Sequence, residues 1–270
     1  MFPLHDDNPI TRPPVVTVGL IVVNSAVFLF TLFLPEAKLQ ELYYRRGFVP
    51  ARLAQLRHGL PLKVPIQQEV IHPLVRLPVR VQRWIRLDPD PPAILLSLVT
   101  CMFLHGGWFH LIGNMWFLWV FGNNVEDRLG SMPFLVFYLC GGLAASFCHW
   151  RIGPDSTLPV IGASGAVAAV LGAYAITWPW ARVHTLVVLV VFITIVDLPA
   201  LLVLGFWFLG QLLEAQKAVN LGVDGGVAWW AHVGGFVAGT VMMLVFGGED
   251  DRRVRRPRKA VVWDDDELDF

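Results

Sequence analysis

The feature that most constrains this chain is a series of long apolar stretches. The first covers residues 15–34 and matches the roughly 20 residues that an α-helix needs to cross a bilayer. Apolar residues make up 55% of the chain and charged residues only 16%, which lies outside the usual balance of a soluble domain. The sequence therefore predicts a protein that crosses a membrane several times.

Five further apolar stretches follow, with tryptophans near several of their ends, where an indole bridges lipid and headgroup. They cover residues 108–121, 134–150, 160–178, about 198–214, and 227–246. We expect an all-α membrane protein, a bundle of six transmembrane helices in residues 15–246. A segment at 1–14 and a charged tail at 247–270 flank this domain, and its long first connection, 38–92, has alternating or amphipathic pieces typical of a membrane interface.

The number of spans depends on residues 183–213, an apolar region broken by Asp197 and Pro199. Two crossings would need roughly forty apolar residues, so we expect one helix from 198 to about 214, with 183–196 at the interface. Ser164 and His232 each lie in the first turns of a predicted span. They reach the same depth only if their spans enter from the same face, which requires a single span between them.

Polar residues inside the predicted spans are few, and each is a functional candidate because placing it in lipid is costly. His110 and Asn114 lie four residues apart and so share one helix face. Ser164 and His232 lie on two other spans. A lone serine or histidine in a membrane is often satisfied by a neighbouring carbonyl, but this set at matched depth is harder to explain that way.

Small residues follow both Ser164 and His232 at helical spacing. They are Ala168 and Gly172 on one span, and Gly235 and Gly239 on the other. Such faces let two helices approach closely in lipid, which would bring the serine and the histidine within hydrogen-bond reach. Plain helix packing would also explain the glycine pair.

Taken in order, these motifs resemble the rhomboid family of intramembrane serine proteases. The pattern is His105-x4-His110-x3-Asn114, Gly122-x3-Glu126-x3-Gly130, Gly162-x-Ser164-Gly165 and Ala231-His232-x2-Gly235-x3-Gly239. The serine motif alone is weak, whereas the four motifs together are specific. The resemblance covers roughly residues 15–246.

The resemblance implies that Ser164 is the nucleophile and His232 the general base of a catalytic dyad. It also implies an oxyanion hole formed by His110, Asn114 and the backbone N–H of Ser164. Since no intramembrane aspartate is placed as a third member, His232 must be oriented by packing or by another hydrogen bond. Supporting roles fall to His105, structural or water-organising, and to Glu126, Gly162, Gly165, Gly235 and Gly239.

One departure from the family pattern concerns the residue four after the nucleophile. Several members carry an aromatic residue there, which stacks on the catalytic histidine. This chain has Ala168, so that contact is absent or supplied elsewhere.

The function implied is hydrolysis of peptide bonds in or beside transmembrane segments. Substrates would be membrane proteins, with lipids as the other partner and with no cofactor, metal or nucleic acid. The sequence has no HExxH motif for a zinc protease, and only Asp197 lies well inside an apolar run, whereas an aspartyl mechanism needs two carboxylates. The alternatives are a non-catalytic rhomboid-like protein that binds membrane helices and, less supported, a solute transporter.

Charge placement indicates orientation. A basic cluster at 252–259 follows the last predicted span, which favours a cytoplasmic C-terminus, and six spans then place the N-terminus on the same side. The arginine-rich first connection would face outward, although long loops obey this charge rule poorly. Because residues 1–14 do not resemble an Arg- and Ser-rich transit peptide, we expect a bacterial plasma membrane.

Overall fold

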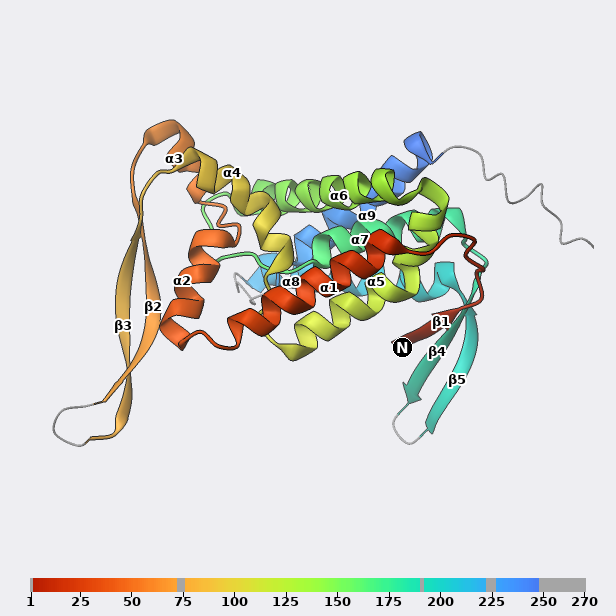
Figure 1. Cartoon of the computed structure of the whole chain (residues 1–270), viewed down its shortest axis with the longest axis horizontal. Coiled ribbons are helices and arrows are strands. Elements are labelled where there is room, and N and C mark those ends of the chain that lie inside the picture. Colours follow the sequence, from red (N-terminus) through yellow and green to blue (C-terminus); the bar gives the residue numbers. More distant parts are fainter. Residues whose placement is uncertain (1, 72–75, 190–191, 222–226, 248–270) are drawn as a thin grey trace, which may run out of the picture.

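The computed structural model describes residues 2–71, 76–189, 192–221 and 227–247, and Figure 1 shows a helical bundle with a β-hairpin near each end. Predicted spans and observed helices agree in place and differ at their ends, where caps and loops decide the boundary. The helices are α1 (Val15–Thr31), α2 (Glu36–Arg46), α3 (Arg52–His58), α4 (Pro91–Thr100), the 3-10 turn η1 (Cys101–Phe103), α5 (Trp108–Leu129), α6 (Ser131–Ile152), α7 (Ser164–Thr177), α8 (Ala200–Leu221) and α9 (Trp229–Phe246).

The expectation of an all-α fold is corrected by two small antiparallel sheets. One of them lies within the first connection and pairs β2 (Leu62–Ile71) with β3 (Pro78–Leu87). Alternate side chains of this hairpin are buried beside α2: Val64, Ile66, Ile85 and Leu87. The alternation of apolar and polar residues thus has the two-residue period of a strand.

The second sheet has the order β1-β4-β5 and joins the N-terminal strand β1 (Phe2–Asp6) to the hairpin of β4 (Arg182–Leu189) and β5 (Phe192–Pro199). Residues 183–196, expected as an interfacial lead-in, therefore form most of a hairpin. Their many valines and isoleucines favour strands, because branching at Cβ restricts the side chain in a helix. As expected, a single helix, α8, then runs from this hairpin toward α9.

Several helices have the composition of membrane spans. Among the residues described, α6 and α9 are long and apolar enough to cross a bilayer, and α4 with α5 would count as a third span although the pair is bent by 81°. Helices α1 and α7 are apolar but shorter, with 17 and 14 residues. These features are those of an integral membrane protein. They give two or three spans among the described residues and so do not confirm the expected count of six.

Helix α7 is at the centre of the bundle, and its residues from Gly165 to Ala175 are all buried. Its small-residue face meets that of α9, as the spacing predicts. A Cβ atom added to Gly239 would lie 1.9 Å from the carbonyl oxygen of Ala169, and one on Gly235 would lie 2.2 Å from that of Gly165. The two backbones touch directly, so these positions accept only glycine.

Glu126 connects α5 to the start of α1. Its two carboxylate oxygens accept hydrogen bonds from the backbone N–H groups of Val16 and Thr17, at 2.9 and 2.7 Å. The hydroxyl of Ser131 also donates to it, at 2.6 Å. Since Pro14 at the N-cap makes no capping bond, Glu126 supplies the cap from another helix, where a negative charge is favourable.

Candidate active site

Ser164 and His232 meet where α7 and α9 begin. Ser164 is the first residue of α7, and its Oγ lies 2.8 Å from Nε2 of His232 in the first turn of α9. Two interhelical contacts set this distance, because Gly235 and Gly239 hold the α9 backbone against α7. As the first residue of its helix, Ser164 also carries a backbone N–H with no intrahelical acceptor.

The other ring nitrogen of His232 is bonded to a residue that the motifs do not include. Nδ1 lies 2.6 Å from Oε1 of Gln211 on α8. An amide oxygen only accepts, so with this geometry Nδ1 carries the proton and Nε2 keeps a lone pair for the Ser164 hydroxyl. Within the described part of the chain, the third group beside the serine and histidine is therefore a neutral amide.

Aromatic side chains pack around His232. The ring of Trp207, on α8, has its centroid 6.1 Å from that of the imidazole, and Trp229 meets the imidazole edge-on at 5.8 Å. Ala168 on α7 cannot make an aromatic contact with His232. Trp207 on α8 and Trp229 on the histidine's own helix, α9, make such contacts instead. Sequence reasoning missed Gln211 and Trp207, although Gln211 is a polar residue inside a predicted span and could have been found by that criterion.

Gly162 has a conformation and a position that require glycine. Its φ is +125°, a left-handed value that side chains disfavour. A Cβ atom there would lie 2.5 Å from Nε2 of His110 and 3.6 Å from Oγ of Ser164. Gly165, next to the serine, lies against α6, where an added Cβ would be 2.6 Å from that of Ala145. These glycines let residues 162–165, which we call the serine loop, fit between the imidazole of His110 and α6.

His110 and Asn114 project from α5 toward the serine loop. The N–H of Gly106 donates to Nδ1 of His110 at 3.4 Å, so in the neutral ring Nε2 carries the proton and is a donor beside Gly162. The amide nitrogen of Asn114 donates to the carbonyl oxygen of His110 at 2.9 Å. The structure thus brings both side chains to the cavity, with Asn114 bonded to its own helix.

His105 lies behind His110 rather than in the cavity. It is completely buried, and the two imidazoles meet edge to face with centroids 5.1 Å apart. Its backbone oxygen accepts a hydrogen bond from the Tyr43 hydroxyl of α2 at 2.9 Å. His105 therefore supports the position of His110.

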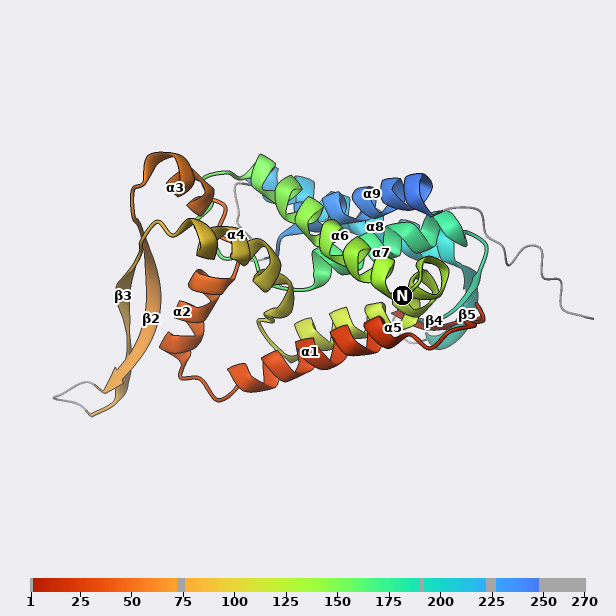
Figure 2. The ribbon, with the colours of Figure 1, turned by 45° about the horizontal axis from the view of Figure 1, so that its top comes forward.

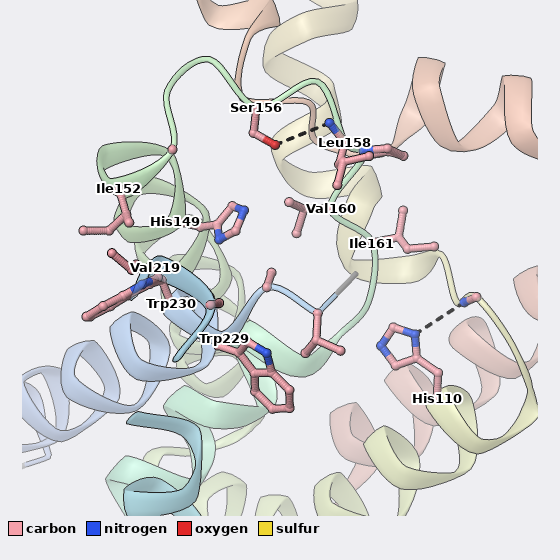
Figure 3. Close-up of a pocket in the computed structure, with 16 residues that line it drawn as sticks. His110, His149, Ile152, Ser156, Leu158, Val160, Ile161, Val219, Trp229 and Trp230 are labelled. Atoms are coloured by element: carbon pink, nitrogen blue, oxygen red, sulfur yellow. Dashed lines mark hydrogen bonds between the residues drawn. The ribbon is translucent and has the colours of Figure 1, made fainter. Parts of the chain in front are cut away.

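Two cavities meet at this site. One, of about 630 Å³, is lined by Ser164, His232, Gln211, His110 and Asn114 together with Trp207 and Phe117. The other, of about 610 Å³, is shown in Figure 3, where Trp229, Trp230, His149 and Ile161 surround it and His110 lies at one side. Because both include Gly106, His110, Ile161, Val227 and Ala228, an extended chain could pass from one to the other beside the serine.

The arrangement has the parts of a nucleophilic site. A hydroxyl faces a lone pair of a neutral imidazole, and donors from α5 and from the start of α7 lie beside it. In the described ranges, no three side chains among His, Cys, Asp and Glu converge as metal ligands would.

Comparisons with known proteins agree with the motifs. A family model described as the Rhomboid domain matches residues 92–249. Rhomboid-like protein 11, chloroplastic, of Arabidopsis thaliana is 35% identical over 162 residues, which are 54% of this chain and 51% of that protein. Rhomboid protein 1, mitochondrial, of Saccharomyces cerevisiae is 27% identical over 194 residues, 68% of this chain and 51% of that protein.

A third relative is presenilin-associated rhomboid-like protein A, mitochondrial, of Danio rerio, 28% identical over 183 residues. That match covers 63% of this chain and 42% of the relative, and the chain spans about half the length of the curated relatives it matches. The family model, in contrast, covers more than half of this chain, and its residues 92–249 include every residue of the candidate site. The chain belongs to the rhomboid family of integral membrane proteins.

Proposed function

We propose that this protein is an intramembrane serine endopeptidase that cleaves other membrane proteins with Ser164 as nucleophile and His232 as general base. The observation that carries the proposal is the 2.8 Å contact between Oγ of Ser164 and Nε2 of His232. This contact lies in a cavity of about 630 Å³, so the pair is accessible to a substrate. A hydroxyl that only satisfied a helix would bond a carbonyl of its own turn instead.

The proposed reaction begins when Oγ of Ser164 attacks the scissile carbonyl carbon and its proton moves to Nε2 of His232. The tetrahedral intermediate then collapses, the C–N bond breaks, and His232 returns the proton to the leaving amine. Water attacks the resulting ester and gives its proton to His232. As the ester bond breaks, His232 returns this proton to Oγ, which releases the acid and regenerates Ser164.

Negative charge on the carbonyl oxygen would be stabilised by His110, Asn114 and the backbone N–H of Ser164. His110 is suited to this because its Nδ1 already accepts the N–H of Gly106, leaving Nε2–H as a donor. Asn114 would have to turn its amide from the carbonyl of His110 to the oxyanion. Each such donor is commonly worth about a hundred- to a thousandfold in rate.

The depth of Ser164 follows from the length of α7. Its 14 residues give about 21 Å of helix, less than the roughly 30 Å of a hydrocarbon core. With the other end of α7 at the far interface, the serine lies below the membrane surface and water reaches it through the cavities. A substrate helix must unwind there, because a helical peptide bond is shielded, so we expect cleavage at small or helix-destabilising residues.

The proposed topology has six spans, α1, α5, α6, α7, α8 and α9, with both termini in the cytoplasm. A bacterial plasma membrane stays a prediction, since the named relatives are mitochondrial or chloroplastic. A reporter fused after Phe270 tests the topology. An extracytoplasmic reporter would contradict either the six spans or their direction.

Cleavage of a tagged single-span protein co-expressed with the chain tests the activity. We expect cleavage by the wild type and none by Ser164→Ala or His232→Ala. Ser97→Ala is a matched control, because it removes a buried serine hydroxyl on α4 that donates to the carbonyl of Ile94 in its own helix and lines neither cavity. Cleavage that persists in both site variants would disprove the dyad, and binding of the tagged helix without any cleavage would favour the non-catalytic alternative.

A further inference from the structure

Gln211 occupies a position that the proposed mechanism leaves without a role. It lies on α8 and lines the same cavity as Ser164 and His232. Its amide oxygen is 2.6 Å from Nδ1 of His232, on the side of the ring opposite the serine. The three groups form one line, from amide to imidazole to hydroxyl.

The aromatic neighbours of His232 do not determine which of the two orientations, related by a 180° turn, the ring adopts within its plane. Trp207 and Trp229 contact the imidazole and restrict the plane in which it lies. Turning the ring by about 180° around its Cβ–Cγ bond preserves that plane but exchanges the positions of nitrogen and carbon atoms. Packing alone therefore does not determine which atom faces Ser164.

A hydrogen-bond acceptor at Nδ1 removes this ambiguity. Because the oxygen of Gln211 only accepts, it favours the ring orientation and the tautomer in which Nδ1 carries the proton. Nε2 then has a free lone pair directed at Oγ of Ser164, as a general base requires. In the opposite tautomer Nε2–H would donate a hydrogen bond to Oγ of Ser164, with no lone pair left there to accept the serine proton.

We infer that Gln211 is a positioning residue that holds His232 in the tautomer able to accept the proton of Ser164. This inference rests on the proposed function. It assigns to a neutral amide on α8 the orienting role that a buried carboxylate has in a serine-histidine-aspartate triad. Gln211 bonds the imidazole of His232 on the side opposite the nucleophile and acts through His232.

The test measures labelling of the purified full-length protein by a fluorescent fluorophosphonate, resolved into the maximal labelling rate and the probe concentration at half that rate. Gln211→Met keeps the length of the side chain but has no amide acceptor, and we expect its maximal rate to fall about ten- to a hundredfold. The half-saturating concentration should stay within about twofold, because the serine and the cavity are retained. Gln211→Glu keeps the acceptor and should stay within about fivefold of the wild-type rate.

Gln216 offers a matched control, since it is an exposed glutamine about 1.4 turns further along α8. Gln216→Met and Gln216→Glu should both label at the wild-type rate. If Gln211→Met does not fold, Gln211→Asn replaces it, because the shorter side chain withdraws the acceptor while keeping the amide, and the same loss of rate is expected.

The outcomes separate the two proposals. A wild type that labels no faster than Ser164→Ala would overturn the proposed function and this inference together. If the wild type labels but a folded Gln211→Met labels equally fast, only the positioning role is wrong. A Gln211→Glu variant as slow as Gln211→Met would also overturn it, because the acceptor would then not be what matters.

Discussion

The two ends of α7 each carry a hydroxyl in a polar network, and the networks differ in access and charge. At its start, Ser164 faces the neutral imidazole of His232 beside a cavity. Near its other end, the hydroxyl of Tyr174 donates to the carboxylate of Asp6 from β1 and accepts a hydrogen bond from Asn8 at 3.1 Å. Figure 2 shows β1 and the β4–β5 hairpin at the end of the bundle away from α2 and α3.

The Tyr174 network is closed by packing. Asn124 donates to Asp6 at 3.0 Å, and Tyr174 itself is completely buried against Phe121 and Trp178. Hydrogen bonding there ties the N-terminal strand to the bundle. A buried hydroxyl with a strong acceptor is therefore not sufficient for chemistry, because a reacting group also needs space for a substrate and a neutral base with a free lone pair.

Apart from the loss expected when Ser164 or His232 is replaced, the largest effect on activity is expected at Gly162. Replacing it by alanine strains a backbone with φ of +125° and places Cβ against His110. We expect the fluorophosphonate labelling rate to fall about a hundredfold, as when one oxyanion donor is lost. Gly205→Ala, at an open position on α8, is the control. A Gly162→Ala rate within twofold of wild type would show that the serine loop tolerates a side chain.

At the opposite end, Tyr174→Phe should reduce stability and leave the chemistry intact. It removes one donor from buried Asp6 but keeps the ring, so we expect a loss of about 1–3 kcal/mol in the free energy of unfolding. The labelling rate of the folded variant should stay near that of wild type. Tyr44→Phe, which removes a tyrosine hydroxyl on α2, is the control. Thermal unfolding in detergent provides the measurement, and a Tyr174→Phe variant that stays stable but loses labelling would contradict the separation of the two ends.

The charge of Asp6 gives a smaller effect that depends on pH. Burial raises the pKa of its carboxyl group above the ordinary 3.8, and this outweighs the opposing hydrogen bond from Tyr174. The folded state thus holds the proton more tightly than the unfolded state, so this group's contribution to stability falls as pH rises through the folded pKa. Asp6→Asn should flatten the acidic part of the curve of melting temperature against pH. If the curve of melting temperature against pH is the same for Asp6→Asn and wild type, the raised pKa of Asp6 is wrong.

The smallest effect is expected at His184 on β4, where Nε2 lies 2.8 Å from Asp7 and Nδ1 lies 2.6 Å from Asp197. These two hydrogen bonds raise the pKa of His184, while His5 stacks on its ring. The stabilisation is complete below the ordinary pKa of 6.5 and is lost as pH rises through the raised value.

We therefore expect His184→Gln to lower the melting temperature slightly in acid and not at alkaline pH. The effect is small because exposed ion pairs contribute little. An equal decrease at both pH values would contradict a charge effect.

Features that depend on residues close together in the sequence were predicted correctly, whereas features that depend on distant residues were missed. Small residues at helical spacing predicted the contact between α7 and α9. Gly235 and Gly239, four residues apart on α9, both lie against the backbone of α7. Strands β4 and β5 were missed where an interfacial lead-in was expected, because an apolar β-branched run has no period that distinguishes a strand from a helix. The pairing of β4 with β1 depends on residues more than 170 positions away.

The membrane class, the central helices and the glycines around Ser164 could be predicted from the amino-acid sequence, because apolar length and the freedom of glycine are properties of local chain chemistry. The sequence also carried the family, through motifs in a fixed order. The contacts of Gln211 with His232 and of Asp6 with Tyr174 became visible only in the folded molecule. Those partners lie on elements without a shared repeat, so which polar groups meet depends on how the helices pack, and no local pattern records that.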